Sequence, residues 1–83
     1  MPFHVYIIYS ASIDRYYTGQ TQDVDDRLFR HNNSGSKSTK KARDWKLVYL
    51  ESFAERSSAV QREMEIKSKK KRSFIESLIK KNG

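Results

Sequence analysis

The sequence predicts an α+β domain: a three-stranded antiparallel sheet flanked by helices, in the order ββαβαα. Two segments rich in β-branched and aromatic residues, FHVYIIY (3–9) and DRYYTGQ (14–20), follow each other closely and predict a β-hairpin. A third segment of this kind, KLVYLESF (46–53), predicts one more strand. Segments with helical periodicity lie between the hairpin and the third strand and again after it, so helices are expected to pack on the sheet.

The hairpin concentrates tyrosines at its centre. If its turn is centred on residues 11–12, Tyr6 lies directly opposite Tyr17 and both phenols project from one face. Gly19 fits a position where the backbone bends or another group approaches closely. Aromatic pairs also simply stabilise hairpins, so the tyrosines alone do not establish a functional site.

The first helix is predicted from Val24 to about Asn32, with Thr21 or Asp23 as its cap. The segment NNSG that follows is a helix breaker, and a polar, basic loop is expected over residues 33–44. After the third strand, RSSAVQREMEIKSKK predicts a second helix with Ser57 or Ser58 as its cap. The segment SFIESLIKK then predicts a shorter third helix.

Length and composition limit the possible functions. The 83 residues make one domain, residues 1–83, which is expected to be a monomer. The absence of cysteine excludes disulfides and thiolate zinc sites, and two histidines, His4 and His31, are too few for the usual zinc site. No segment approaches the ~20 apolar residues of a membrane span, and no signal peptide is recognised, so a soluble, cytoplasmic protein is expected.

The charge is unevenly distributed along the chain. Residues 1–36 carry three basic and four acidic side chains, whereas residues 37–83 carry fourteen basic and six acidic ones. Basic clusters suit binding of nucleic-acid phosphates, although each cluster alone also suits a solvated surface. The predicted nucleic-acid-binding residues are Lys37, Lys40, Lys41, Arg43, Lys67, Lys69, Lys70 and Lys71.

The second helix carries a carboxylate on its apolar face. The apolar residues that define this face are Ala59, Val60, Met64 and Ile66. Glu63 and Lys67 fall inside the same arc. A buried carboxylate is costly unless it is paired or binds a cation, so Glu63 is either an ion-pair partner of Lys67 or a metal or active-site residue.

The first helix carries two more candidates. Val24 and Leu28 are expected to face the core, and Arg27 and His31, four residues apart, share the flank beside them. The planar guanidinium of arginine suits phosphate. A lone histidine is more often a structural hydrogen-bonding residue than a catalyst, but His31 shares its flank with Arg27.

Four of these segments together resemble a known family. VYI (5–7), YTG (17–19), DVDDRLFRHNNSG (23–35) and AVQREMEIK (59–67) resemble the GIY-YIG nuclease superfamily, and within it the small single-domain bacterial branch known as the UPF0213 or YhbQ-like group. The resemblance extends from about Phe3 to Lys70. Three signature positions differ: His4 replaces the first glycine, Val5 the following isoleucine and Thr18 the second isoleucine.

The resemblance implies a metal-dependent endonuclease that hydrolyses phosphodiester bonds of DNA, with structure rather than sequence selectivity, in DNA repair or recombination. It implies that Glu63 holds one Mg²⁺ or Mn²⁺ ion and that Arg27 binds the phosphate oxygens. Tyr6 or His31 would be the general base, and Tyr17 would orient the water or phosphate. Two alternatives stay open: a non-catalytic nucleic-acid-binding module of the same fold, and an interaction protein whose basic tail binds a protein or ribosomal partner.

Overall fold

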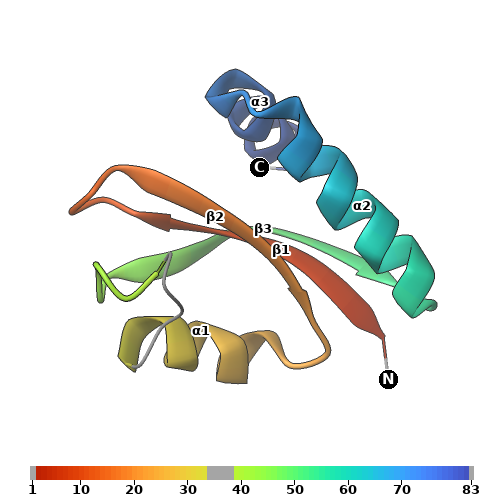
Figure 1. Ribbon diagram of the computed structural model, residues 1–83, viewed down its shortest axis with the longest axis horizontal. Helices are drawn as coiled ribbons and strands as arrows, with labels where there is room; N and C mark the ends of the chain where they lie inside the picture. The colour runs from red at the N-terminus through yellow and green to blue at the C-terminus, as the bar shows by residue number, and fades with distance from the viewer. Residues whose placement is uncertain (1, 34–38, 83) are drawn as a thin grey trace.

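The structure is a computed structural model that describes residues 2–33 and 39–82. Its elements are β1 (Phe3–Ser10), β2 (Arg15–Thr21), α1 (Val24–Asn33), β3 (Trp45–Phe53), α2 (Arg56–Lys69) and α3 (Arg72–Asn82). The sheet has the strand order β2-β1-β3, and both pairings are antiparallel. The predicted fold class and element order are confirmed (Figure 1). Within the described part of the chain, no helix has the length and apolar character needed to cross a membrane.

The hairpin register differs from the prediction. Tyr6 lies opposite Gly19, and Ile8 rather than Tyr6 lies opposite Tyr17. The predicted register is wrong by two residues because the turn spans residues 11–14, and Asp14 in it adopts a left-handed conformation with φ of 53°. A shift of two residues leaves every side chain on its original face. Tyr6 and Tyr17 therefore project from the same face, but as diagonal neighbours.

The central strand β1 is buried on both faces of the sheet. Four consecutive side chains, Val5, Tyr6, Ile7 and Ile8, are no more than 2% exposed. α1 covers one face of the sheet, and α2 and α3 cover the other (Figure 1). Because successive side chains of a strand point to opposite faces, β1 contributes to two separate clusters.

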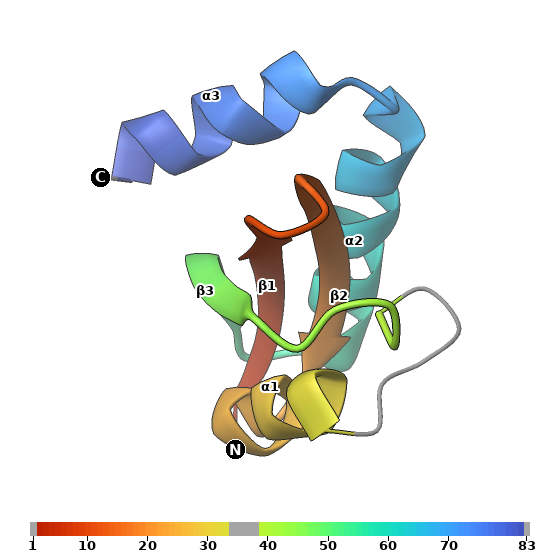
Figure 2. The ribbon, with the colours of Figure 1, turned by 90° about the vertical axis from the view of Figure 1, so that its left-hand side faces the viewer.

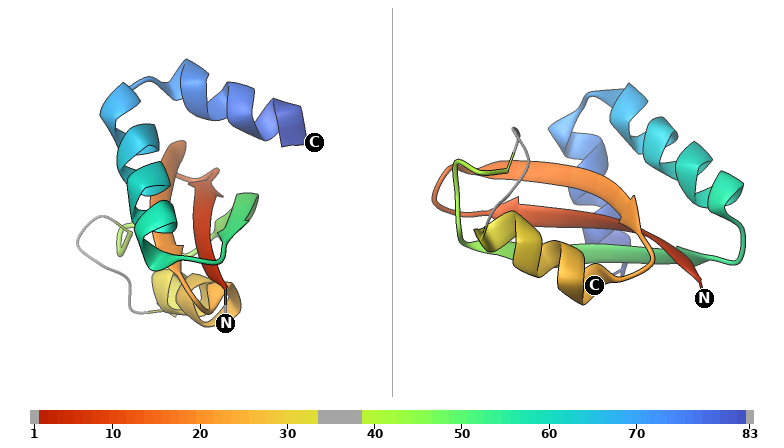
Figure 3. Two further views of the ribbon diagram at one scale, coloured as in Figure 1. Left: turned by 90° about the vertical axis from the view of Figure 1, so that its right-hand side faces the viewer. Right: turned by 60° about the horizontal axis from the view of Figure 1, so that its bottom comes forward.

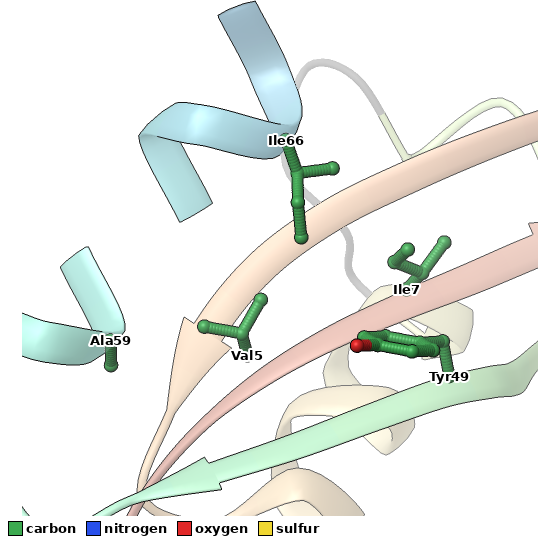
Figure 4. Packing of buried hydrophobic residues seen from close by; sticks show 5 residues of the cluster. All are labelled: Val5, Ile7, Tyr49, Ala59 and Ile66. Carbon is green, nitrogen blue, oxygen red and sulfur yellow. The ribbon is translucent and has the colours of Figure 1, made fainter. Parts of the chain in front are cut away.

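The two clusters divide the apolar residues by face. Against α2 and α3 the buried residues are Val5, Ile7, Tyr49, Ala59 and Ile66 (Figure 4). Against α1 they are Tyr6, Ile8, Ala42 and Trp45, with Ile13, Tyr17 and Leu28 packed around them. Tyr6 and Tyr17 thus belong to the α1 side of the molecule.

Polar contacts fix both ends of α1. The Asp26 backbone N–H donates to Asp23 Oδ1 at 3.0 Å, which confirms Asp23 as the cap. At the other end, the Asn32 amide pairs with the Trp45 backbone: Nδ2 donates to the carbonyl at 3.1 Å, and the Trp45 N–H donates to Oδ1 at 2.7 Å. The Trp45 indole N–H also donates to the Thr39 carbonyl at 2.9 Å. These bonds attach α1 and the segment around Thr39 to the start of β3.

Two predictions about α2 are wrong. Glu55, not a serine, occupies the N-cap position, and it makes no side-chain capping bond; Ser57 and Ser58 lie within the helix. Met64 is 64% exposed rather than part of the apolar face. At ~100° per residue Met64 stands roughly 140° from Ala59, which places it outside the buried arc. The face that packs on the sheet is narrower than predicted: Ala59 and Ile66 are at its centre, and Glu63 lies at its edge.

The turn between α2 and α3 lies against the hairpin turn. α2 ends at Lys70, which is left-handed with φ of 52°, and α3 then crosses at a steep angle to α2 (Figure 2). Arg72 at the start of α3 donates to Asp14 Oδ1 at 2.6 Å and to the Asp14 carbonyl at 3.2 Å. Its guanidinium also lies 5.1 Å from the centre of the Tyr16 ring. The last basic residue of the KSKKKR run is therefore held in structural contacts.

Candidate active site

Three aromatic side chains meet on the α1 side of the sheet, at β2. The ring centres of Tyr6 and Tyr17 lie 6.5 Å apart, those of Tyr6 and His31 lie 5.9 Å apart, and those of Tyr17 and His31 lie 4.9 Å apart. They come from β1, β2 and α1, three elements that the fold brings together. We call Tyr6, Tyr17 and His31 the aromatic cluster.

Gly19 allows the Tyr6 phenol to extend over β2. A Cβ atom built on Gly19 would lie 2.5 Å from the Tyr6 hydroxyl oxygen and 2.7 Å from Cζ, distances that no side chain tolerates. The close approach expected at this glycine is therefore that of the Tyr6 ring itself. Because the ring lies over Gly19, the hydroxyl group of a central strand reaches the edge strand of the sheet.

A buried chain of hydrogen bonds holds the Tyr6 hydroxyl. Tyr6 Oη lies 2.8 Å from His31 Nε2, and His31 Nδ1 lies 2.9 Å from Thr39 Oγ1. His31 is only 5% exposed, and Thr39 is fully buried. Sequence reasoning missed Thr39, since it is one polar residue in the basic stretch KSTKKAR and no periodicity or motif distinguishes it.

Burial determines the protonation states of this pair. Burial raises the pKa of the Tyr6 hydroxyl above its usual range, and Tyr17 and Glu63 raise it further, against the opposite effect of Arg27. Burial and the positive charge of Arg27 lower the pKa of His31. At neutral pH Tyr6 is therefore protonated and His31 is neutral. In the tautomer that carries its proton on Nδ1, the phenol donates to Nε2 and the Nδ1–H group donates to Thr39.

Glu63 approaches the aromatic cluster from α2, which lies beside the edge strand β2 (Figure 3). Its side chain is 18% exposed, and Oε2 accepts a hydrogen bond from Lys67 Nζ at 2.6 Å. Lys67 Nζ lies 5.8 Å from the centre of the Tyr17 ring. The predicted ion pair is present, and it lies beside the cluster, where the charge of Glu63 acts on Tyr6.

Arg27 lies on the exposed flank of α1, one turn before His31. Its charge acts on both Tyr6 and His31. None of the acidic residues that the structure describes forms an ion pair with it. An arginine that is directed at a site and has no protein carboxylate as partner is suited to bind an anion there.

The site contains one carboxylate rather than a cage of ligands. In the described ranges, no group of three or more His, Asp or Glu side chains is placed to hold a metal ion. Mg²⁺ commonly binds through one or two carboxylates, with water and substrate phosphates as its other ligands. Glu63 is the residue that could supply such a carboxylate, and in this structure the Lys67 ammonium group contacts its Oε2.

Two open grooves adjoin the aromatic cluster on either side of Tyr17. The larger, of about 800 Å³, lies between β2 and the α2–α3 turn, and the predicted residues Lys67, Lys70 and Lys71 line it. We call it the α2 groove. The smaller, of about 490 Å³, is lined by Lys41 together with Trp45.

The other basic residues predicted to bind nucleic acid lie elsewhere. Lys40 and Arg43 are exposed on the segment before β3. Lys69 Nζ lies 5.7 Å from the centre of the Phe74 ring. Lys37 lies outside the described residues. Arg15 lines both grooves but was not predicted; its only sequence signal is a basic residue directly before two tyrosines.

The chain matches known proteins over most of its length. A family model described as the GIY-YIG catalytic domain matches residues 2–77. The chain belongs to the GIY-YIG family. A UPF0213 protein from Staphylococcus saprophyticus is 41% identical over 69 residues, which cover 82% of this chain and 84% of the relative. Another from Haloquadratum walsbyi is 42% identical over 67 residues, which cover 80% of this chain and 75% of the relative.

A solved structure extends the similarity to the fold. The solution NMR structure of a UPF0213 protein from Bacillus halodurans matches with a TM-score of 0.64 at 32% identity, covering 100% of this chain and 87% of that one. The names of this protein and of the two relatives state no activity.

The departures from the GIY-YIG signature lie away from the aromatic cluster. His4 Nδ1 lies 2.7 Å from Ser52 Oγ on β3, which is the strand on the far side of β1 from β2. Val5 is buried on the opposite face, against α2. Thr18 also alternates with Tyr17 and Gly19 and so points away from their face. The three substitutions therefore leave the positions of Tyr6, Tyr17 and Gly19 intact.

Proposed function

We propose that the protein is a divalent-cation-dependent endonuclease that hydrolyses phosphodiester bonds of DNA. One observation carries this proposal: the Tyr6–His31 hydrogen bond, the Glu63 carboxylate and the Arg27 guanidinium lie close together beside a basic groove. These groups supply a proton acceptor, a cation ligand and a phosphate ligand. The family match supports the same activity, since the matching model is described as a catalytic domain.

Tyr6 and His31 act together as the general base. Because the pKa of Tyr6 is raised, the phenol is a poor base alone, but neutral His31 holds a free electron pair at Nε2. As the attacking water loses a proton to Tyr6 Oη, the phenolic proton passes to Nε2. The hydroxide forms the new P–O bond while one ester P–O bond breaks, and solvent protonates the departing oxygen. Tyr6 is 2% exposed, so the reacting water must enter the site to reach its hydroxyl group.

The other residues bind and orient the phosphate. Arg27 contacts its non-bridging oxygens, where negative charge increases in the transition state. Tyr17, whose ring adjoins His31 and lines both grooves, orients the water or phosphate. Glu63 holds one Mg²⁺ or Mn²⁺ ion. Such an ion stabilises negative charge on the phosphate and the departing oxygen.

The substrate is proposed to be selected by structure rather than by sequence. Lysines and arginines that line the grooves neutralise phosphates, which carry no sequence information. A role in DNA repair or recombination is consistent with such selectivity.

The test is a cleavage assay on labelled single-stranded, duplex and branched DNA with Mg²⁺, with Mn²⁺ and with EDTA. Glu63→Gln is expected to abolish metal-dependent cleavage, because the cation loses its carboxylate. Tyr6→Phe is expected to reduce the rate ~10²–10⁴-fold, the usual contribution of general base catalysis. Glu65→Gln and Tyr9→Phe make the same chemical changes on α2 and β1 outside the site and are expected to retain activity.

Full cleavage by Glu63→Gln, or cleavage that persists in EDTA, would contradict the proposal. Salt-sensitive DNA binding without cleavage in either metal would favour the alternative, a non-catalytic module of the same fold.

A further inference from the structure

The α2 groove combines two kinds of surface. Its less exposed lining consists of apolar and aromatic residues together with Thr18, and Ile13, Tyr17, Ile66 and Ile75 supply the apolar surface. The exposed residues along it are Asp14, which is paired with Arg72, and five basic residues, Arg15, Lys67, Lys70, Lys71 and Arg72. A ligand that fills the groove must therefore offer both flat or apolar groups and negative charge.

Not all of the basic residues along the α2 groove are available to bind an anion. Arg72 is neutralised by Asp14 and Glu76, and Lys67 by Glu63. Lys70 and Lys71 form no ion pair with any acidic residue of the described chain. These two lysines are therefore free to bind an anionic ligand.

The groove is continuous with the proposed active site. Tyr17 belongs both to its lining and to the aromatic cluster, and Lys67 belongs both to its lining and to the ion pair with Glu63. A chain molecule bound in the groove would thus extend directly to the cleavage site.

We infer that the α2 groove binds unpaired nucleotides of a nucleic-acid strand, next to the phosphodiester that is cut. This inference rests on the proposed nuclease function and names its substrate class. Single strands expose both phosphates and base faces, and proteins bind them through basic grooves with aromatic platforms. Here Lys70 and Lys71 would contact the phosphates, while bases would pack on Tyr17 and the isoleucines.

A duplex does not match this surface as well. Its bases are stacked inside and only its backbone faces outward, so it would contact the lysines and leave the apolar inner surface without a partner. The volume of about 800 Å³ falls in the ~300–1,000 Å³ range of pockets that enclose small molecules. That size accommodates bases.

The inference is tested by equilibrium binding of the full chain in EDTA, where the proposed cleavage cannot occur. Fluorescence anisotropy compares four labelled ligands: oligo-dT, oligo-rU, an abasic DNA strand of the same length and a blunt duplex. Oligo-dT is expected to bind at least ~10-fold more tightly than the abasic strand and the duplex, because base stacking on aromatic residues is lost in both.

A pair of charge-matched variants locates the binding site. Lys70→Gln/Lys71→Gln is expected to weaken oligo-dT binding and reduce its salt slope by ~1–1.5, as lost phosphate contacts require. Lys80→Gln/Lys81→Gln removes the same charge at the far end of α3 and is expected to leave both nearly unchanged.

The outcomes separate this inference from the proposed function. Equal binding of duplex, abasic strand and oligo-dT would overturn it even if the protein cuts duplex DNA, and so would full binding by Lys70→Gln/Lys71→Gln. Preferential oligo-dT binding without cleavage of any DNA in the metal assay would support the groove and contradict the nuclease. Tighter binding of oligo-rU than of oligo-dT would support the groove and identify RNA as its ligand.

Discussion

The position of the Tyr6 hydroxyl depends on the missing side chain at Gly19. The phenol occupies the space that a Cβ atom would need, and His31 then holds the hydroxyl from the other side. Gly19 does not adopt a left-handed conformation, so its role is to provide space rather than backbone freedom. A single methyl group at this position would therefore disturb the site directly.

Gly19→Ala is expected to lower the free energy of unfolding by ~1–3 kcal/mol, the usual cost of overpacking, and to displace the Tyr6–His31 pair. A Gly→Ala change in a strand without such a close contact would instead stabilise the protein by ~0.4–1 kcal/mol, because alanine reduces the conformational entropy of the unfolded chain. Urea unfolding followed by circular dichroism measures the difference. In a Tyr6→Leu background the cost should largely disappear, and a fully stable Gly19→Ala variant would contradict the proposed contact.

At the residue scale, sequence reasoning named most of the residues that meet at the candidate site. Tyr6, Tyr17, Arg27, His31 and Glu63 were each distinguished by type and helical or strand position, and the fold brings their charges and rings together. Their partners were harder to find. Thr39 lies in the segment before β3, and the path of this segment brings it to His31. Such a segment has no regular alternation of buried and exposed residues from which the burial of Thr39 could be predicted.

At the scale of the element, α2 presents the site and its end forms the groove. Glu63 lies at the edge of the face that packs on the sheet, and Lys70 terminates the helix in a left-handed conformation. A residue other than glycine pays ~1–2 kcal/mol for that conformation. A basic residue here is explained if it contributes to binding in the α2 groove.

Lys70→Gly is expected to increase the free energy of unfolding by up to ~1 kcal/mol, because the relief of left-handed strain exceeds the entropy cost of glycine. The same variant should bind oligo-dT more weakly. Urea unfolding and anisotropy measured on one preparation test both effects. Lys71→Gly, in the next position, has no such strain to relieve and should only lose stability. A Lys70→Gly variant that is less stable than wild type would contradict the argument.

The prediction of elements failed where the chain lacks the usual local signals. Strand and helix positions were correct to within one or two residues, because apolar periodicity is strong in β1, β3 and α3. The hairpin turn lies one residue further along the chain than expected, at residues 11–14, where Asp14 rather than a glycine takes the left-handed position. The cap of α2 was misassigned because Glu55 occupies the N-cap position and makes no side-chain capping bond. No pattern of residue types predicts a helix start of this kind.

At the scale of the whole molecule, one small turn connects distant parts of the chain. Residues 11–14 join β1 to β2, and two carboxylates secure them. Asp44 accepts hydrogen bonds from the Ser10 hydroxyl at 2.5 Å and from the Ser12 N–H at 2.9 Å. Asp14 pairs with Arg72 of α3 at 2.6 Å. The hairpin, the segment before β3 and α3 are thereby held together through charged groups.

These contacts make stability dependent on pH in the acid range. Hydrogen bonds from Ser10 and Ser12 lower the pKa of Asp44 from 3.8 to about 2. Hydrogen bonds from Arg72 and Tyr9 lower the pKa of Asp14 to about 2 as well. Because the folded pKa lies below the unfolded value, the stabilisation is present above pH ~4 and is lost as the pH falls to about 2.

Asp44→Asn is therefore expected to be less stable than wild type at pH 7, and the difference should shrink steadily between pH ~4 and 2. Urea unfolding midpoints measured across this range give the comparison. Asp25→Asn, an exposed change in the first turn of α1, serves as the control and should show no comparable convergence with wild type. Because Asp14 and Asp44 hold the same turn, the double variant should lose less stability than the two single losses combined. A difference for Asp44→Asn that stays constant down to pH 2 would show that its carboxylate charge does not hold the turn.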